Sequence, residues 1–78
     1  MYEIQMPKFG QTMLEGEISE WYVKVGDHVD KGDPVCQVST EKIVNEVETY
    51  ESGTVKELLY EEGDVVEIGK IICRIEKD

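Results

Sequence analysis

The chain has 78 residues, which allows one domain with a modest core and leaves little room for a deep catalytic cleft. Its 18 acidic and 8 basic residues give a net charge of −10, which disfavours nucleic acid and anionic membrane surfaces as partners and favours basic protein surfaces. No apolar run approaches the roughly 20 residues of a membrane span. The first ten residues lack the pattern of a signal peptide, so we expect an intracellular chain.

Two halves of the sequence repeat without a gap at an offset of 37 residues, the spacing from Gly16 to Gly53. Each half reads as a glycine, an apolar strand, a Gly-Asp turn, a valine, a glycine and a second apolar strand. This pattern predicts two equivalent halves related by a pseudo-twofold axis. The matched pairs include Gly26 and Gly63, Asp27 and Asp64, Val29 and Val66, Gly32 and Gly69, and Cys36 and Cys73.

Short segments rich in β-branched and aromatic residues predict strands along the whole chain. In chain order they cover 17–23, 35–38, 43–47, the segment after Gly53, and 71–75. The second of these strands continues through residue 40. Turns are predicted at 26–27, 32–34 and 63–64, and no segment has apolar residues at helical spacing for long enough to form a helix. We therefore predict an all-β fold, a flattened barrel or sandwich of two antiparallel sheets.

The segments 38–40 and 43–47 leave only Glu41 and Lys42 for a turn, which predicts a hairpin although neither residue is glycine or asparagine. In the repeat, the equivalent of Lys42 would be position 79, one residue past the last residue of the sequence. The hairpin tip and the C-terminus are therefore expected on opposite sides of the axis. A lysine on such a tip is open to the active site of another enzyme, and a swinging carrier requires this geometry.

Other residues that could support chemistry have simpler structural explanations. Asp27, Asp33 and Asp64 each follow a glycine in a turn, where aspartate is common for backbone reasons, so we do not assign them as catalytic carboxylates. His28 is expected in a turn, facing solvent. With one histidine and no CxxC pair, the sequence predicts no metal site.

The two cysteines occupy equivalent positions in predicted strands. Cys36 and Cys73 are expected to be small buried apolar side chains, and a disulfide is the alternative if the axis brings them together. Trp21 aligns with Leu58 in the repeat, which favours packing in or beside the core over a role as a stacking platform.

Several motifs together resemble the lipoyl domains of 2-oxo acid dehydrogenase complexes, which belong to the biotinyl/lipoyl attachment family. The resemblance covers essentially the whole chain and treats residues 1–78 as one lipoyl domain. The motifs are Met6-Pro7-Lys8-Phe9-Gly10, Thr12-Met13-Leu14-Glu15-Gly16, Trp21-Tyr22-Val23-Lys24-Val25-Gly26-Asp27, Gly32-Asp33, Val38-Ser39-Thr40-Glu41-Lys42-Ile43 and Glu61-Glu62-Gly63-Asp64.

The resemblance implies that Lys42 carries lipoic acid in amide linkage, attached by a lipoate ligase or lipoyltransferase. Glu41 and Ile43 depart from the commonest family pattern, Thr-Asp-Lys-Ala, and the Glu-Lys-Ile tip resembles carriers of acetoin dehydrogenase complexes. Biotin carriers usually place methionine on both sides of the lysine, so the flanks favour lipoate. The glycine cleavage carrier is a longer protein.

The resemblance also implies a carrier without catalytic residues of its own. A thiamine-diphosphate dehydrogenase would reductively acylate the lipoyl group, an acyltransferase core would pass the acyl group to coenzyme A, and dihydrolipoyl dehydrogenase would reoxidise the dithiol. The parent chain would be a dihydrolipoyl acyltransferase, as in pyruvate or acetoin dehydrogenase complexes, or a dihydrolipoyl dehydrogenase with a fused lipoyl domain. We expect a monomeric domain in the cytoplasm, or in the mitochondrial matrix of a eukaryote.

Partners are expected to recognise residues around the tip. The candidates are Thr40, Glu41 and Ile43, together with the loop at Phe9, Gly10 and Gln11. Two alternatives to the lipoyl carrier remain open at this stage: a biotin carrier, and an interaction or structural domain in which Lys42 is an ordinary surface residue.

Overall fold

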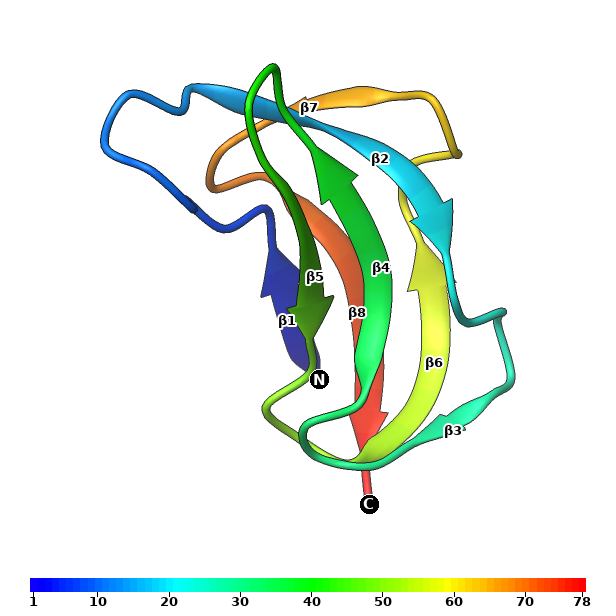
Figure 1. Cartoon of the computed structure of the whole chain (residues 1–78). Helices are drawn as coiled ribbons and strands as arrows, with labels where there is room; N and C mark the ends of the chain where they lie inside the picture. The colour runs from blue at the N-terminus through cyan, green and yellow to red at the C-terminus, as the bar shows by residue number, and fades with distance from the viewer.

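Eight short strands and no helix make up the structure, a computed structural model that describes residues 1–78. The strands form two four-stranded antiparallel sheets (Figure 1). The hairpin sheet has the order β5-β4-β2-β7, and the terminal sheet has the order β1-β8-β6-β3. The strands are β1 (Tyr2–Gln5), β2 (Glu15–Trp21), β3 (His28–Val29), β4 (Pro34–Ser39), β5 (Val44–Glu48), β6 (Gly53–Leu58), β7 (Val65–Glu67) and β8 (Ile71–Lys77).

No strand of one sheet pairs with a strand of the other, so the fold is a flattened sandwich and not a closed barrel. The predicted all-β architecture of two antiparallel sheets is thereby confirmed. Fourteen buried hydrophobic residues form one core between the sheets, with Ile18, Val38, Val55 and Ile75 among those almost fully buried. In β2 and β6, one strand from each sheet, alternate side chains are buried, as in sheets with one solvated face.

The predicted repeat appears as a pseudo-twofold relation that exchanges the two sheets. An offset of 37 residues takes β2 to β6, β3 to β7 and β4 to β8. The turns obey the same relation: Gly26 N–H donates to Val55 O at 2.8 Å, and Gly63 N–H donates to Ile18 O at 2.7 Å. Gly26 and Gly63 have φ values of +98° and +95°, a conformation that other residues rarely adopt.

The aspartates in these turns bind backbone, as the sequence predicted. The Oδ2 atom of Asp27 accepts a hydrogen bond from Lys24 N–H at 2.9 Å, and Oδ2 of Asp64 accepts one from Glu61 N–H at 2.8 Å. Asp33 accepts the corresponding bond from Asp30 N–H at 2.9 Å. The three carboxylates therefore stabilise separate turns.

The first strands of the two halves, β1 and β5, are not related by the offset of 37 residues. Met6 and Thr49 are both buried, and their carbonyl oxygens accept equivalent hydrogen bonds from Gly69 and Gly32 at 3.0 and 2.7 Å. These two residues are 43 positions apart, so β1 and β5 are equivalent with an offset six residues larger than the rest. The β1–β2 connection is therefore the longer one, and its loop projects beside the β4–β5 hairpin (Figure 1).

Both cysteines are fully buried and free, which confirms the prediction that they are small core side chains and leaves the disulfide unformed. Burial raises the pKa of Cys36 to about 12 and the pKa of Cys73 to about 11. Trp21 is half-buried against the core, as expected, and its indole N–H donates to Tyr60 O at 2.9 Å.

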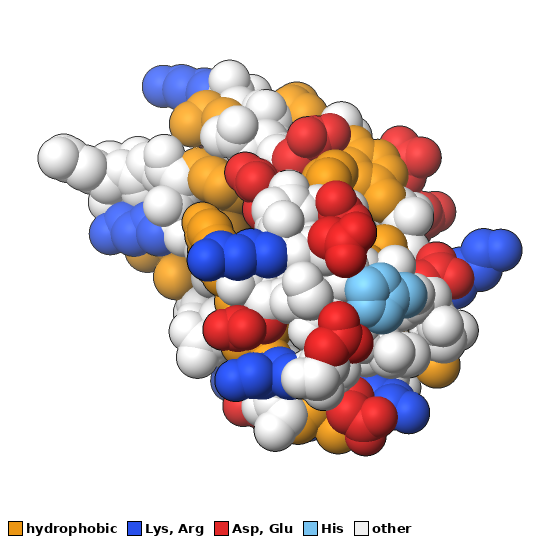
Figure 2. Space-filling view, turned by 90° about the horizontal axis from the view of Figure 1, so that it is seen from below, with side chains coloured by type: hydrophobic (Ala, Val, Ile, Leu, Met, Phe, Trp, Pro, Cys, Tyr) orange, Lys and Arg blue, Asp and Glu red, His pale blue; other side chains and the backbone are white.

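Two details differ from the sequence-based prediction. His28 is the first residue of β3 and not part of a turn. Its side chain is half exposed, and its Nε2 atom lies 3.0 Å from Oδ2 of Asp78. The sequence pattern does not predict the strands β1, β3 and β7, because strands of two to four residues are too short to show a clear alternation. Figure 2 views the end of the molecule near the C-terminus, where acidic and basic side chains are interspersed.

Candidate functional site

The β4–β5 hairpin ends in the two-residue turn that the sequence predicted. Ser39 pairs with Val44, and Thr40 N–H donates to Ile43 O at 2.7 Å, which leaves only Glu41 and Lys42 outside the ladder. No residue other than glycine has a positive φ. The turn therefore forms without the left-handed backbone that the most favoured hairpin turns require.

The Thr40 side chain closes the turn in place of a special turn residue. Its Oγ1 accepts a hydrogen bond from Ile43 N–H at 3.2 Å and lies 3.4 Å from Ile43 O, to which it can donate. Threonine hydroxyls often satisfy turn backbone in this way. Thr40 thus holds the two ends of the turn together and fixes the positions from which Glu41 and Lys42 project.

Lys42 lies at an extremity of the molecule. Its side chain is exposed and takes part in none of the ion pairs of the structure. The hairpin tip is at one end of a molecule 35 Å long, and the C-terminus is at the other end, as the repeat predicted (Figure 1). A group attached to Lys42 would extend away from the body of the domain.

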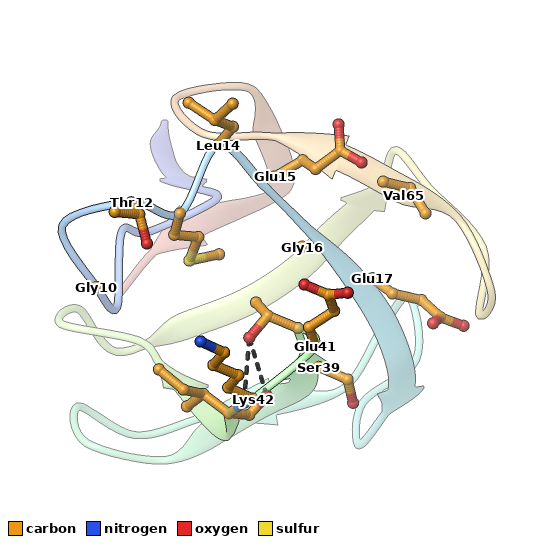
Figure 3. Close-up of a pocket in the computed structure, with 13 residues that line it drawn as sticks. Gly10, Thr12, Leu14, Glu15, Gly16, Glu17, Ser39, Glu41, Lys42 and Val65 are labelled. Atoms are coloured by element: carbon orange, nitrogen blue, oxygen red, sulfur yellow. Dashed lines mark hydrogen bonds between the residues drawn. The ribbon is translucent and has the colours of Figure 1, made fainter.

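A groove of about 840 Å³ separates the hairpin from the β1–β2 loop (Figure 3). The loop is held by Ile68 N–H, which donates to Leu14 O at 3.1 Å, and by a turn in which Met13 N–H donates to Gly10 O at 3.2 Å. The groove is lined by Gly10, Thr12, Met13, Leu14, Glu15, Gly16, Glu17, Ser39, Thr40, Glu41, Lys42, Ile43 and Val65. It mixes apolar and acidic side chains beside the exposed lysine.

The predicted recognition residues do not all meet in this groove. Gly10 faces the hairpin across it, since a methyl group placed on Gly10 would lie 3.8 Å from Cδ1 of Ile43. Phe9 packs against the core and lines a separate groove between β1 and β5. Gln11 is exposed at the end of the loop and lines neither groove.

The far wall of the groove is not among the residues that the sequence predicts for the site. Leu14 is the last residue of the β1–β2 loop, Glu15 and Glu17 come from the start of β2, and Val65 comes from the adjacent strand β7. A signal was present in the repeat: the connection before Gly16 is six residues longer than the one before Gly53, so an extra loop was to be expected at this position alone.

No group of three or more His, Cys, Asp or Glu side chains is arranged to hold a metal ion. The structure also contains no helix that could cross a membrane. The candidate site is thus one exposed lysine with its flanking groove.

Comparisons with known proteins identify the family of the chain. The biotin/lipoyl family model, described as "Biotin-requiring enzyme", matches residues 2–75. The chain is 42% identical over 76 residues to the lipoamide acyltransferase component of the branched-chain alpha-keto acid dehydrogenase complex of Bacillus subtilis, covering 97% of this chain and 18% of that protein. It is 43% identical over 73 residues to the succinyltransferase component of the 2-oxoglutarate dehydrogenase complex of Staphylococcus saprophyticus, covering 94% and 17%. The chain thus spans less than a fifth of the length of these relatives.

Solved structures show the same fold. The lipoyl domain of the 2-oxoglutarate dehydrogenase complex from Azotobacter vinelandii superimposes with a TM-score of 0.80 at 26% identity, covering 99% of this chain and 98% of that one. The urea carboxylase of Kluyveromyces lactis matches with a TM-score of 0.73 at 27% identity, covering 97% of this chain and 7% of that one. With a family model matched over nearly its whole length and a lipoyl-domain fold, the chain belongs to the biotin/lipoyl attachment family.

Proposed function

We propose that this domain is a lipoyl carrier and that Lys42 is the residue to which lipoic acid is attached. The observation that carries the proposal is the position of Lys42: an exposed lysine in a two-residue hairpin turn, at the end of the molecule opposite to the C-terminus. Two relatives at 42% and 43% identity are named as a lipoamide acyltransferase and a dihydrolipoyllysine-residue succinyltransferase, which supports lipoate as the attached group.

The residues present fit an amide-linked group. Lys42 has no ion pair to break, and the exposed turn leaves space around the side-chain amine for the active site of a ligase. Amide formation joins the amine to the carboxyl group of lipoic acid with loss of water and removes the positive charge. When bound, lipoic acid supplies a disulfide that can accept electrons and an acyl group.

The chain itself contributes position and orientation. The paired strands β4 and β5 and the Thr40 side chain hold the attachment point rigidly, so that the long lysine stem and its attached group provide the mobility. Glu41 and Ile43 flank the lysine and are available to the enzymes that receive it. A tether of this kind converts encounters between separate proteins into intramolecular ones, which raises the effective concentration of the carried group.

We further propose that the domain serves the acyltransferase component of a 2-oxo acid dehydrogenase complex. The relatives are named for branched-chain, 2-oxoglutarate and pyruvate complexes, so the class of complex is supported and the individual substrate is left open. The implied partners are a thiamine-diphosphate dehydrogenase, an acyltransferase core, dihydrolipoyl dehydrogenase and the enzyme that attaches lipoate.

Biotin attachment is the second candidate, because the matching family model is described as "Biotin-requiring enzyme" and a urea carboxylase shares the fold. The flanks of the lysine distinguish the two. Glu41 and Ile43 stand where biotin carriers usually have methionine, which favours lipoate.

The proposal is tested by incubating the domain with lipoate–protein ligase, ATP and lipoate, and mapping modified peptides by mass spectrometry. We expect one lipoyl group on Lys42 in the wild type and none in Lys42→Arg, which keeps the charge but cannot form this amide. Lys24→Arg, which changes an exposed lysine in another connection, is the matched control and should be modified like the wild type.

A further variant tests the position and not only the residue type. The double variant Glu41→Lys/Lys42→Glu keeps composition and net charge but moves the lysine one place along the turn. Because successive residues of the turn project in different directions, we expect this variant to remain unmodified. Modification of the displaced lysine, or of Lys42→Arg at another lysine, would contradict the assignment.

A further inference from the structure

The two sheets differ in charge although the pseudo-twofold axis makes them equivalent. The strands of the terminal sheet contain three acidic residues and three basic ones, Lys or Arg. The strands of the hairpin sheet contain six acidic residues and no basic one. These six are Glu15, Glu17, Glu20, Glu46, Glu48 and Glu67.

The outer face of the terminal sheet neutralises its own charges. The Arg74 guanidinium donates to the carboxylates of Glu3 at 3.0 Å and Glu57 at 2.6 Å. Lys56 and Glu76 form a further ion pair at 3.6 Å. All ion pairs of the structure lie on strands of this sheet or on residues that flank them. Figure 2 shows mixed charges at the end where the C-terminus lies.

The hairpin sheet lacks the two central cations. The offset of 37 residues places Ser19 at the position of Lys56 and Gln37 at the position of Arg74. Ser19 donates to Oε1 of Gln37 at 3.0 Å and accepts from the hydroxyl of Ser39 at 3.0 Å, so the centre of this face is a closed network of neutral groups. The surrounding carboxylates are left without cationic partners.

This face adjoins the lysine. A row of side chains crosses the sheet next to the hairpin turn, where strand pairing aligns Val44 with Ser39, Ser39 with Glu17, and Glu17 with Val65. Val44 and Val65 are 60% and 58% exposed although both lie within strands. Exposed apolar side chains among polar and charged ones are typical of a surface that a protein partner covers.

We propose that the enzyme that attaches lipoate to Lys42 docks on the outer face of the hairpin sheet and covers it with a surface rich in lysine or arginine. Charge complementarity identifies this occupant, because uncompensated carboxylates beside a neutral centre would repel an acidic partner and attract a basic one. The terminal sheet, whose three carboxylates are already paired, offers no such attraction. The difference between the sheets would orient the domain so that Lys42 reaches the partner first.

This inference rests on the proposed function, and the enzyme that attaches lipoate supplies its test. We would measure initial rates of lipoylation against domain concentration for two double variants that each raise the net charge by two units. Glu17→Gln/Glu46→Gln alters the hairpin face, and Glu3→Gln/Glu76→Gln alters the terminal face. Glu3 is the pseudo-twofold equivalent of Glu46, so the second variant is a matched control for the first. Melting curves establish that both double variants are folded.

We expect the hairpin-face variant to raise KM for the domain by about threefold or more with little change in kcat, and the terminal-face variant to leave KM unchanged. The difference should largely vanish in about 0.5 M salt, where charges on the surface are screened. Equal KM values for the two double variants, with normal modification of the wild type, would overturn the docking proposal alone. A wild-type domain that no ligase modifies would overturn the proposed function and this inference together.

Discussion

Alanine at the turn glycines offers a quantitative check on the pseudo-twofold fold. Gly26 and Gly63 have φ values of +98° and +95°, and a methyl group on either would meet nothing within 4 Å. The cost is therefore backbone strain without a steric clash, about 1–2 kcal/mol of unfolding free energy after allowance for the lower entropy of unfolded alanine. The hydrogen bonds of both glycines involve only backbone atoms and remain available to the variants.

For a domain of this size, a loss of 1–2 kcal/mol lowers Tm by roughly 5–15 °C. Thermal and urea unfolding followed by circular dichroism should give similar losses for Gly26→Ala and Gly63→Ala, because the two turns are equivalent. Gly10→Ala is the control: Gly10 has no positive φ and its added methyl group would make only an ordinary contact, so we expect a change within about 0.5 kcal/mol. Unchanged stability of both turn variants, or an equal loss for Gly10→Ala, would refute this reasoning.

Three further predictions concern the hairpin, the histidine and the cysteines. Thr40→Val should lower the unfolding free energy by about 0.5–1.5 kcal/mol in urea titrations, because Ile43 N–H loses the hydroxyl that accepts its hydrogen bond. Thr40→Ser keeps this hydroxyl and should not lower the unfolding free energy. Equal losses in the two variants would exclude the hydroxyl as the cause. The hydrogen bond and charge of Asp78 raise the pKa of His28 above 6.5, so this pair stabilises the fold below about pH 6.5 and the contribution is lost as the pH rises through the raised value. The Tm difference between wild type and Asp78→Asn should thus be larger at about pH 5.5 than at about pH 8.5, and the reverse order would contradict the pairing. Burial raises the pKa of Cys36 to about 12 and the pKa of Cys73 to about 11. Both thiols should therefore react slowly with a disulfide reagent in the folded domain and rapidly in denaturant. Rapid reaction in the folded state would show that the thiols are accessible.

The sequence allowed the repeat, the turn glycines and the hairpin at Lys42 to be predicted because each rests on local chemistry. Gly26 and Gly63 mark turns by their conformational freedom, and the two strands around Glu41 and Lys42 leave no other place for a turn. The pairing partners could not be predicted in the same way. The approach of Val65 to Glu17 depends on strand pairing across some fifty residues, which local patterns do not encode.

Other features of the structure also depend on the fold and not on local sequence. The bond between His28 and Asp78 joins residues 50 positions apart in sequence. Phe9 and Gly10 are neighbours in sequence, yet the fold directs them to different grooves. The charge difference between the sheets became visible only when the topology assigned each strand to a sheet.

The central claim, that Lys42 carries lipoate, is tested most directly by a competition between the two cofactors of the family. The domain would be co-expressed with a lipoate ligase and a biotin ligase, with both acids supplied, and its intact mass and peptide map determined. The account predicts a single lipoyl group on Lys42 and no biotin. Biotin on Lys42, or a domain that neither ligase modifies, would contradict it.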